Sequence, residues 1–196
     1  FDDNLLQILR ALGTFSSLVN ICVFGSPSLL KKSSLFKYLL AMSVADFGYL
    51  FPLLIFFEFN KRCSPSASLC GETGQYIVWI FLVALSDLLT SSLALFSIIM
   101  ENFLTVQRFL LLSNKKSALL NKLKEIHIIL IIALISLLFY LPLAFQRTIN
   151  PRLILLNGTN MTEYRLESTQ FGNSYAGRII PTIQSTIRLI LSAPLL

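Results

Sequence analysis

Several charged side chains lie inside long apolar runs of this sequence, and these are the residues best suited to carry chemistry: Asp46, Asp87, Glu101 and Arg108. A charge at bilayer depth is costly, so such a residue usually faces the interior of a helix bundle and marks an ion site, a proton relay or a switch. The alternative is that they are helix-packing groups and snorkelling ends. Asp46 and Glu101 lie deep in their runs, and for them we favour a function.

The third apolar run places its polar and small residues on one helical face. They recur at steps of three and four, which is the spacing of a single stripe. At about 1.5 Å per residue, the stripe is roughly 30 Å long, so one end lies near each face of a bilayer. Helix packing explains the Thr and Ser hydroxyl groups of this stripe equally well as a functional role does. The stripe consists of Asp87, Thr90, Ser91, Ala94, Ser97, Glu101, Thr105 and Arg108.

The composition indicates a membrane protein. The chain has 196 residues, of which 55% are hydrophobic and 13% charged, and its mean hydropathy is +0.72. A soluble domain carries about a quarter charged residues. The net charge of +6 does not indicate nucleic acid, because Lys and Arg lie mainly between the apolar runs, as membrane topology requires. No nucleophile–base pair, phosphate loop, cofactor motif or metal-ligand spacing is visible, so neither an enzyme nor a metal site is expected.

The apolar runs predict an all-α membrane protein with four transmembrane helices and part of a fifth. A span needs about 20 residues, so the long third run is tilted or extends beyond the bilayer. We expect one transmembrane domain over residues 1–196, incomplete at both ends. The predicted helices are approximately 11–30, 38–57, 76–112, 126–146 and 179–196.

The loop charges predict the orientation in the membrane. Basic residues in short loops mark the cytoplasmic side, so the N-terminus is expected outside and the protein in the plasma membrane. Two glycosylation sequons, at Asn157 and Asn160, fall in the fourth connection, which this topology also places outside. The second connection has Lys61 and Arg62 balanced by Glu58 and Glu72. The first and third connections carry an excess of lysine: Lys31, Lys32, Lys37, Lys115, Lys116, Lys122 and Lys124.

Four short motifs resemble those of rhodopsin-like G-protein-coupled receptors, and their order and spacing agree with this topology. The first helix has Leu18-Val19-Asn20, and the second has Leu40-Ala41-Met42-Ser43-Val44-Ala45-Asp46, similar to the family's Leu-x-x-Ala-x-x-Asp. The third ends in Val106-Gln107-Arg108-Phe109, similar to Asp-Arg-Tyr. The fifth has Ser192-Ala193-Pro194, similar to a mid-helix proline. The Gln-Arg-Phe form and Phe171-Gly172 resemble divergent invertebrate receptors.

The resemblance implies a seven-helix bundle that signals to a heterotrimeric G protein. It implies that Gln107, Arg108 and Phe109 form the inner switch. A polar network, with water or a sodium ion, would join Asp46 and Ser97 to Asn20 and Glu101. Ile98 would pack against Pro194.

The chain also departs from the family. Gln107 replaces the acid beside the arginine, so the usual local ion pair is absent. The fourth connection has no cysteine, so the usual disulfide to the third helix cannot form. Cys63 and Cys70 could pair with each other outside the cell, although sequence does not show the geometry.

The residues of the outer half favour a peptide ligand over a small amine. Counting from Arg108, Thr90 occupies the position where amine receptors have an aspartate, and a hydroxyl cannot pair with an ammonium. Asp87 lies one turn further out, and Arg188 of the fifth helix lies at a similar height. Charges of both signs in one pocket suit a peptide-like agonist. Pairing of Asp87 with Arg188, or an interfacial Arg188, is the alternative.

A secondary transporter or channel is the competing function. Asp46, Asp87 and Glu101 would then be ion or proton sites. Transporters often have helices interrupted by Gly or Pro, and here Gly48 and Pro52 are the mid-span examples, which argues weakly against this reading. A third alternative is an unfolded or pseudogene-derived product.

Overall fold

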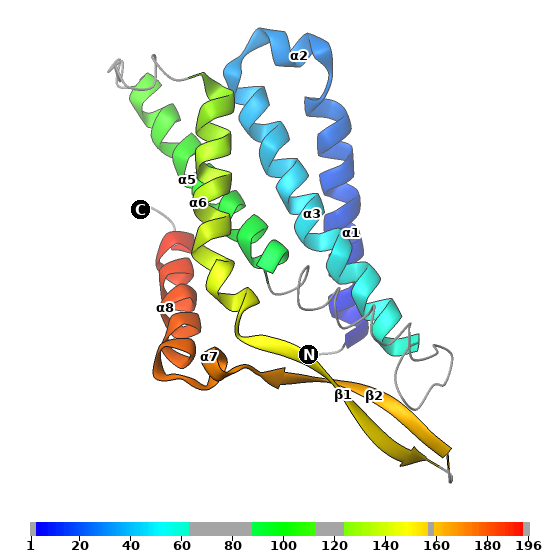
Figure 1. Ribbon diagram of the computed structural model, residues 1–196. Coiled ribbons are helices and arrows are strands. Elements are labelled where there is room, and N and C mark those ends of the chain that lie inside the picture. Colours follow the sequence, from blue (N-terminus) through cyan, green and yellow to red (C-terminus); the bar gives the residue numbers. More distant parts are fainter. Residues whose placement is uncertain (1–2, 63–87, 113–123, 157–158, 194–196) are drawn as a thin grey trace.

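The computed structural model describes residues 3–62, 88–112, 124–156 and 159–193, and it is mostly helical (Figure 1). The helices run roughly alongside one another, and a two-stranded hairpin extends from one end. In chain order the elements are α1 (Asp3–Phe24), α2 (Pro27–Lys32), α3 (Ser34–Arg62), α5 (Ser91–Leu112), α6 (Glu125–Ala144), β1 (Arg147–Leu156), β2 (Thr159–Ser168), α7 (Gln170–Asn173) and α8 (Tyr175–Ser192).

Four helices in the described part of the chain are long and apolar enough to cross a membrane. They cover Leu5–Phe24, Ser34–Ile55, Leu88–Leu110 and Glu125–Ala144. The α6 helix is an example, because large apolar side chains such as Leu130, Leu134 and Leu138 are exposed along it. Exposing such a surface to water is unfavourable, whereas contact with the hydrocarbon of a bilayer is favourable.

The core lies where α3, α5 and α6 meet. Met100 of α5 is fully buried, and it packs with Tyr38 and Ala45 of α3 and with Ile132 of α6. The ring of Tyr38 meets that of Phe103 edge-on, with centroids 5.4 Å apart. This cluster determines how the three helices face one another.

The first helix begins and ends earlier than the predicted range of residues 11–30. It starts at Asp3 and ends at Phe24, where Gly25 follows. A Cβ on Gly25 would lie 2.7 Å from the backbone oxygen of Ile21, so a larger residue does not fit there. Pro27 then starts the short helix α2, as proline favours a first helical position.

Other boundaries also differ from the prediction. The second helix begins at Ser34 and continues to Arg62, so the start of the predicted polar stretch is helical. The fourth helix, Glu125–Ala144, differs by two residues or fewer at each end. α8 begins at Tyr175, because the Ser174 hydroxyl accepts a hydrogen bond from the Gly177 amide. The predicted segment 76–87 of the third helix lies outside the described residues.

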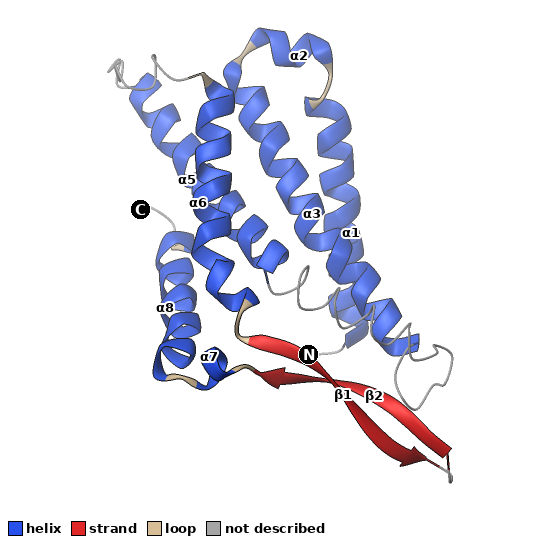
Figure 2. Cartoon of the chain, viewed as in Figure 1, coloured by secondary structure: helices blue, strands red, loops and turns tan. Residues whose placement is uncertain are grey.

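The fourth connection contains a β-hairpin, so the expectation of an all-α chain is wrong for this segment (Figure 2). β1 and β2 are antiparallel, with Arg147 opposite Ser168 and Leu156 opposite Thr159. The sequence between them is Asn157-Gly158, a pair typical of two-residue hairpin loops. Asn157 is thus part of a turn signal as well as of a sequon.

The lysines of the first connection and the hairpin lie at opposite ends of the bundle. α2 and the start of α6 lie at one end, and the hairpin lies at the other (Figure 1). Lys31 and Lys32 belong to the α2 end, where the Lys37 ammonium also meets the Glu125 carboxylate at 3.4 Å. Lys31, Lys32 and Lys37 therefore lie at the opposite end of the bundle from Asn160 of β2.

We expect the full-length protein to carry glycans on the hairpin. An Asn157→Gln/Asn160→Gln double variant should lose the glycosidase-sensitive mass, because both sequons lie on the side predicted to be outside. Gel mobility after glycosidase treatment measures this, with Asn173→Gln, which lies in no sequon, as the control. Labelling of Lys31 or Lys32 by an impermeant amine reagent on intact cells would contradict the topology.

Candidate functional site

The candidate site is a hydrogen bond between two spans near the middle of their length. The Ser97 hydroxyl of α5 donates to the Asp46 carboxylate of α3 at 2.7 Å. Both side chains are half-buried, and their hydrogen bond joins α3 to α5. Hydrogen bonds to a carboxylate are stronger than those between neutral groups, and this one lies near the middle of two apolar, span-length helices.

The predicted four-residue network is only partly assembled among the described residues. Asn20 and Glu101 are exposed, and neither side chain hydrogen-bonds to Asp46 or Ser97 in the described part of the structure. The Glu101 backbone carbonyl accepts a hydrogen bond from Thr105. The structure therefore brings together Asp46 and Ser97 and leaves the other two on uncovered helix faces.

The polar stripe of α5 passes from a covered to an uncovered surface. Thr90 and Ala94 are buried, at 3% and 8% exposure, whereas Glu101, Thr105 and Arg108 are exposed. A carboxylate and a guanidinium thus lie on a face that no described element covers.

The predicted switch residues have different environments. Arg108 and Phe109 are exposed, whereas Gln107 is half-buried and its side-chain oxygen Oε1 is buried without a hydrogen-bond partner. A buried acceptor left unpaired is unfavourable. Gln107 is therefore directed into the bundle, while Arg108 remains available at the surface.

Arg188 of α8 lies against α6. Its guanidinium is close enough to the Tyr140 hydroxyl for a side-chain hydrogen bond, and one turn earlier the Gln184 amide donates to the Phe139 carbonyl at 2.5 Å. Asp87 lies outside the described residues, so its predicted pairing with Arg188 stays a prediction. The contact with Tyr140 gives Arg188 a structural role, because it joins α8 to α6.

A hydrogen bond that sequence reasoning missed joins α5 to α8. The Asn102 amide donates to the Leu191 carbonyl at 2.8 Å, in the last turn of α8, where carbonyls lack helical partners. The available signal was an asparagine within an apolar run. The predicted partner pair involved Ile98, which is half-buried, and Pro194, which lies outside the described residues.

The remaining predicted sites fall largely outside the described residues. This applies to Asn157 and to both cysteines of the predicted disulfide, Cys63 and Cys70. Asn160 is the second residue of β2, opposite Leu155. Within the described ranges, no cluster of three or more His, Cys, Asp or Glu side chains could hold a metal ion.

No family model, curated protein or solved structure matches this chain.

Proposed function

We propose that this chain is part of a G-protein-coupled receptor that transmits binding of an external, peptide-like ligand to a heterotrimeric G protein. The observation that supports it most is the Asp46–Ser97 hydrogen bond. The two residues come from the α3 aspartate motif and the α5 polar stripe, which the resemblance matched independently. When both helices are aligned with those of a rhodopsin-like receptor, Asp46 and Ser97 are expected to lie in contact.

The uncovered charges of α5 support a larger bundle. Glu101 lies near the middle of the Leu88–Leu110 span and is exposed. An ionised side chain facing lipid at this depth is unfavourable. In the proposed seven-helix receptor, further membrane helices cover Glu101 and Arg108 and supply their polar partners.

The proposed mechanism needs no chemical reaction. Ligand binding at the hairpin end favours one of two helix packings, and the opposite end changes shape for the G protein. Arg108 and Phe109 are exposed and available for that contact, whereas Asp46 and Ser97 connect two spans in between. Any bound sodium ion would lie beside the Asp46 carboxylate.

The test uses the full-length protein in vesicles with purified heterotrimeric G protein. Peptide and amine libraries are screened for ligand-dependent nucleotide exchange, and ion flux is measured in parallel. Exchange stimulated by a peptide supports the proposal. Activation by a micromolar amine that persists in Asp87→Ala would contradict the peptide class, and flux without nucleotide exchange would favour the transporter.

We expect Gln107→Asp to lower basal signalling by a few-fold at most. A carboxylate is costly to bury, so an acid at this position should turn out of the bundle, where it pairs with the neighbouring Arg108 and restrains it. Pairing at a partly exposed site contributes about 1 kcal/mol or less. Nucleotide exchange without ligand, at equal surface expression, measures the change. Gln107→Glu tests whether charge alone suffices, and unchanged basal output in both variants would contradict the expectation.

A further inference from the structure

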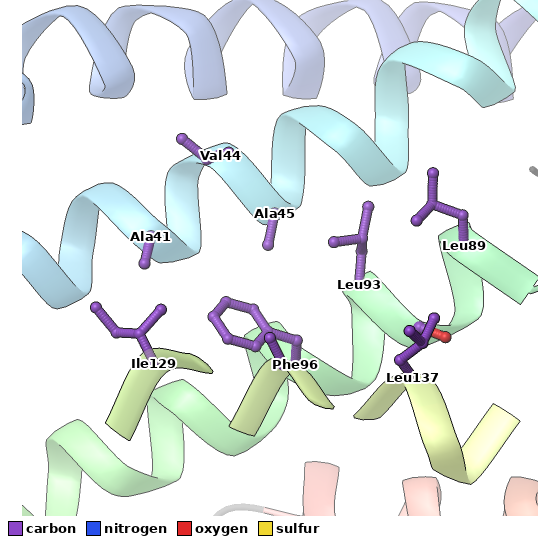
Figure 3. A pocket seen from close by; sticks show the side chains of 10 residues that line it. Ala41, Val44, Ala45, Leu89, Leu93, Phe96, Ile129 and Leu137 are labelled. Carbon is purple, nitrogen blue, oxygen red and sulfur yellow. The ribbon is translucent and has the colours of Figure 1, made fainter. Parts of the chain in front are cut away.

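A hollow of about 400 Å³ lies where α3, α5 and α6 meet. Short side chains create it, because Ala41 and Ala45 of α3 and Ala133 of α6 leave space that larger residues would fill. Phe96 and Ile129 face the two α3 alanines across this space (Figure 3). The hollow is therefore a consequence of alanines at matching heights on two helices.

The chemistry of the hollow suits hydrocarbon. Its wall is apolar, and the hydroxyl of Ser92 already donates to the Leu88 carbonyl of its own helix. Val44 and Leu137 at its border are exposed, so the hollow opens on the surface that faces lipid. An apolar cavity of about 150 Å³ accepts benzene, so by proportion this one accommodates roughly sixteen carbon atoms.

Positive charge lies next to one end of this hollow. Lys37 precedes Ala41 by four residues on α3, and Glu125 precedes Ile129 by four on α6, so each is about 6 Å further along its helix. Lys37 and Lys124 are both exposed, and Lys37 is bridged to Glu125 at 3.4 Å. With two lysines and one acid, this mouth carries a net positive charge.

We propose that the hollow and its lysine mouth, together the α3–α6 groove, bind one anionic phospholipid. Its phosphate lies at Lys37 and Lys124, and one acyl chain lies among Ala41, Ala45 and Ala133. Basic sites between membrane helices bind anionic headgroups in this way. From Glu125 to Leu137, α6 rises about 18 Å, comparable with the roughly 15 Å of hydrocarbon in one leaflet.

Photocrosslinking of the purified chain in phosphatidylcholine nanodiscs tests the site. A trace phospholipid carries a diazirine on its acyl chain and either a serine or a choline headgroup. We expect the phosphatidylserine probe to label peptides containing Ala45, Phe96 or Ala133 more strongly. A basic residue near an anionic surface contributes about 1 kcal/mol, so Lys124 should account for about fivefold of the preference. Lys37 should account for less, because it is already paired with Glu125.

Variants separate the headgroup from the chain. Lys37→Gln/Lys124→Gln should remove the serine preference, whereas Lys31→Gln/Lys32→Gln, with the same change in charge, should retain it. Ala133→Leu should reduce labelling by both probes, with Ala133→Val used if thermal unfolding shows that the leucine variant does not fold. Equal labelling of the native chain by the two probes, or equal losses in the two lysine pairs, would overturn the proposal.

Discussion

Ser97→Ala is expected to lower the free energy of unfolding of the membrane-embedded chain by about 1–3 kcal/mol. The Ser97 hydroxyl donates to the Asp46 carboxylate at 2.7 Å between two spans. Its removal leaves a half-buried charged acceptor without this donor, at a depth where water replaces it poorly. Thermal unfolding in nanodiscs of one composition measures the loss.

Two variants make this result specific. Ser97→Thr retains the hydroxyl and should retain more of the stability. Thr105→Ala removes an exposed hydroxyl on the same helix, one that bonds only to the Glu101 carbonyl of its own helix in the described structure, and should change stability little. A loss in Ser97→Ala no larger than that in Thr105→Ala would contradict the importance of the contact.

The charge of Asp46 is tested separately from its hydrogen bond. Asp46→Asn retains an acceptor for Ser97, so the contact between α3 and α5 should persist while the negative charge is lost. If a sodium ion lies beside this carboxylate, any sodium dependence of ligand affinity in the full-length protein should disappear in this variant. A native protein that shows no such dependence would contradict the sodium part alone.

Met100→Ala should have the largest effect on stability, lowering the free energy of unfolding by about 2–5 kcal/mol. Met100 is fully buried and contacts the cluster that holds α3, α5 and α6 together. Truncation removes packing contacts on several sides, and the neighbouring helices relax only partly. Thermal or denaturant unfolding of the full chain measures this loss.

A matched pair of variants controls for position and size. Met100→Leu conserves most of the volume and should cost less than about 1.5 kcal/mol. Val106→Ala truncates a side chain of the same helix that is 47% exposed, so it should cost little. Similar losses for Met100→Ala and Val106→Ala would show that the three-helix cluster does not determine stability.

Local patterns determined the membrane-spanning elements. The apolar run beginning near residue 126 forms α6, Glu125–Ala144. A long apolar surface is stable in the hydrocarbon of a bilayer, and there the backbone must form a helix to satisfy its hydrogen bonds. The helix ends were less predictable. Ser174, which caps α8, acts through one side-chain hydrogen bond that hydropathy does not reveal.

The sequence at the tip of the hairpin carries a turn signal and a glycosylation sequon in the same residues. Asn157-Gly158 is typical of a two-residue hairpin loop, and the flanking strands pair from Arg147–Ser168 to Leu156–Thr159.

The contact between Asn102 and the Leu191 carbonyl has no local sequence signal of this kind. It joins residues far apart in the chain, and no spacing rule within one helix predicts it.

Helical periodicity depends only on spacing along one segment, so the sequence predicts which polar residues share a face of each helix. Which of those faces meet depends on how the helices pack together. Asp46 and Ser97 come together, whereas Asn20 and Glu101 remain exposed. The physical reason is that the rotation and crossing of the helices are determined by the packing of large and small side chains such as Met100 and Ala45, which involves several segments at once.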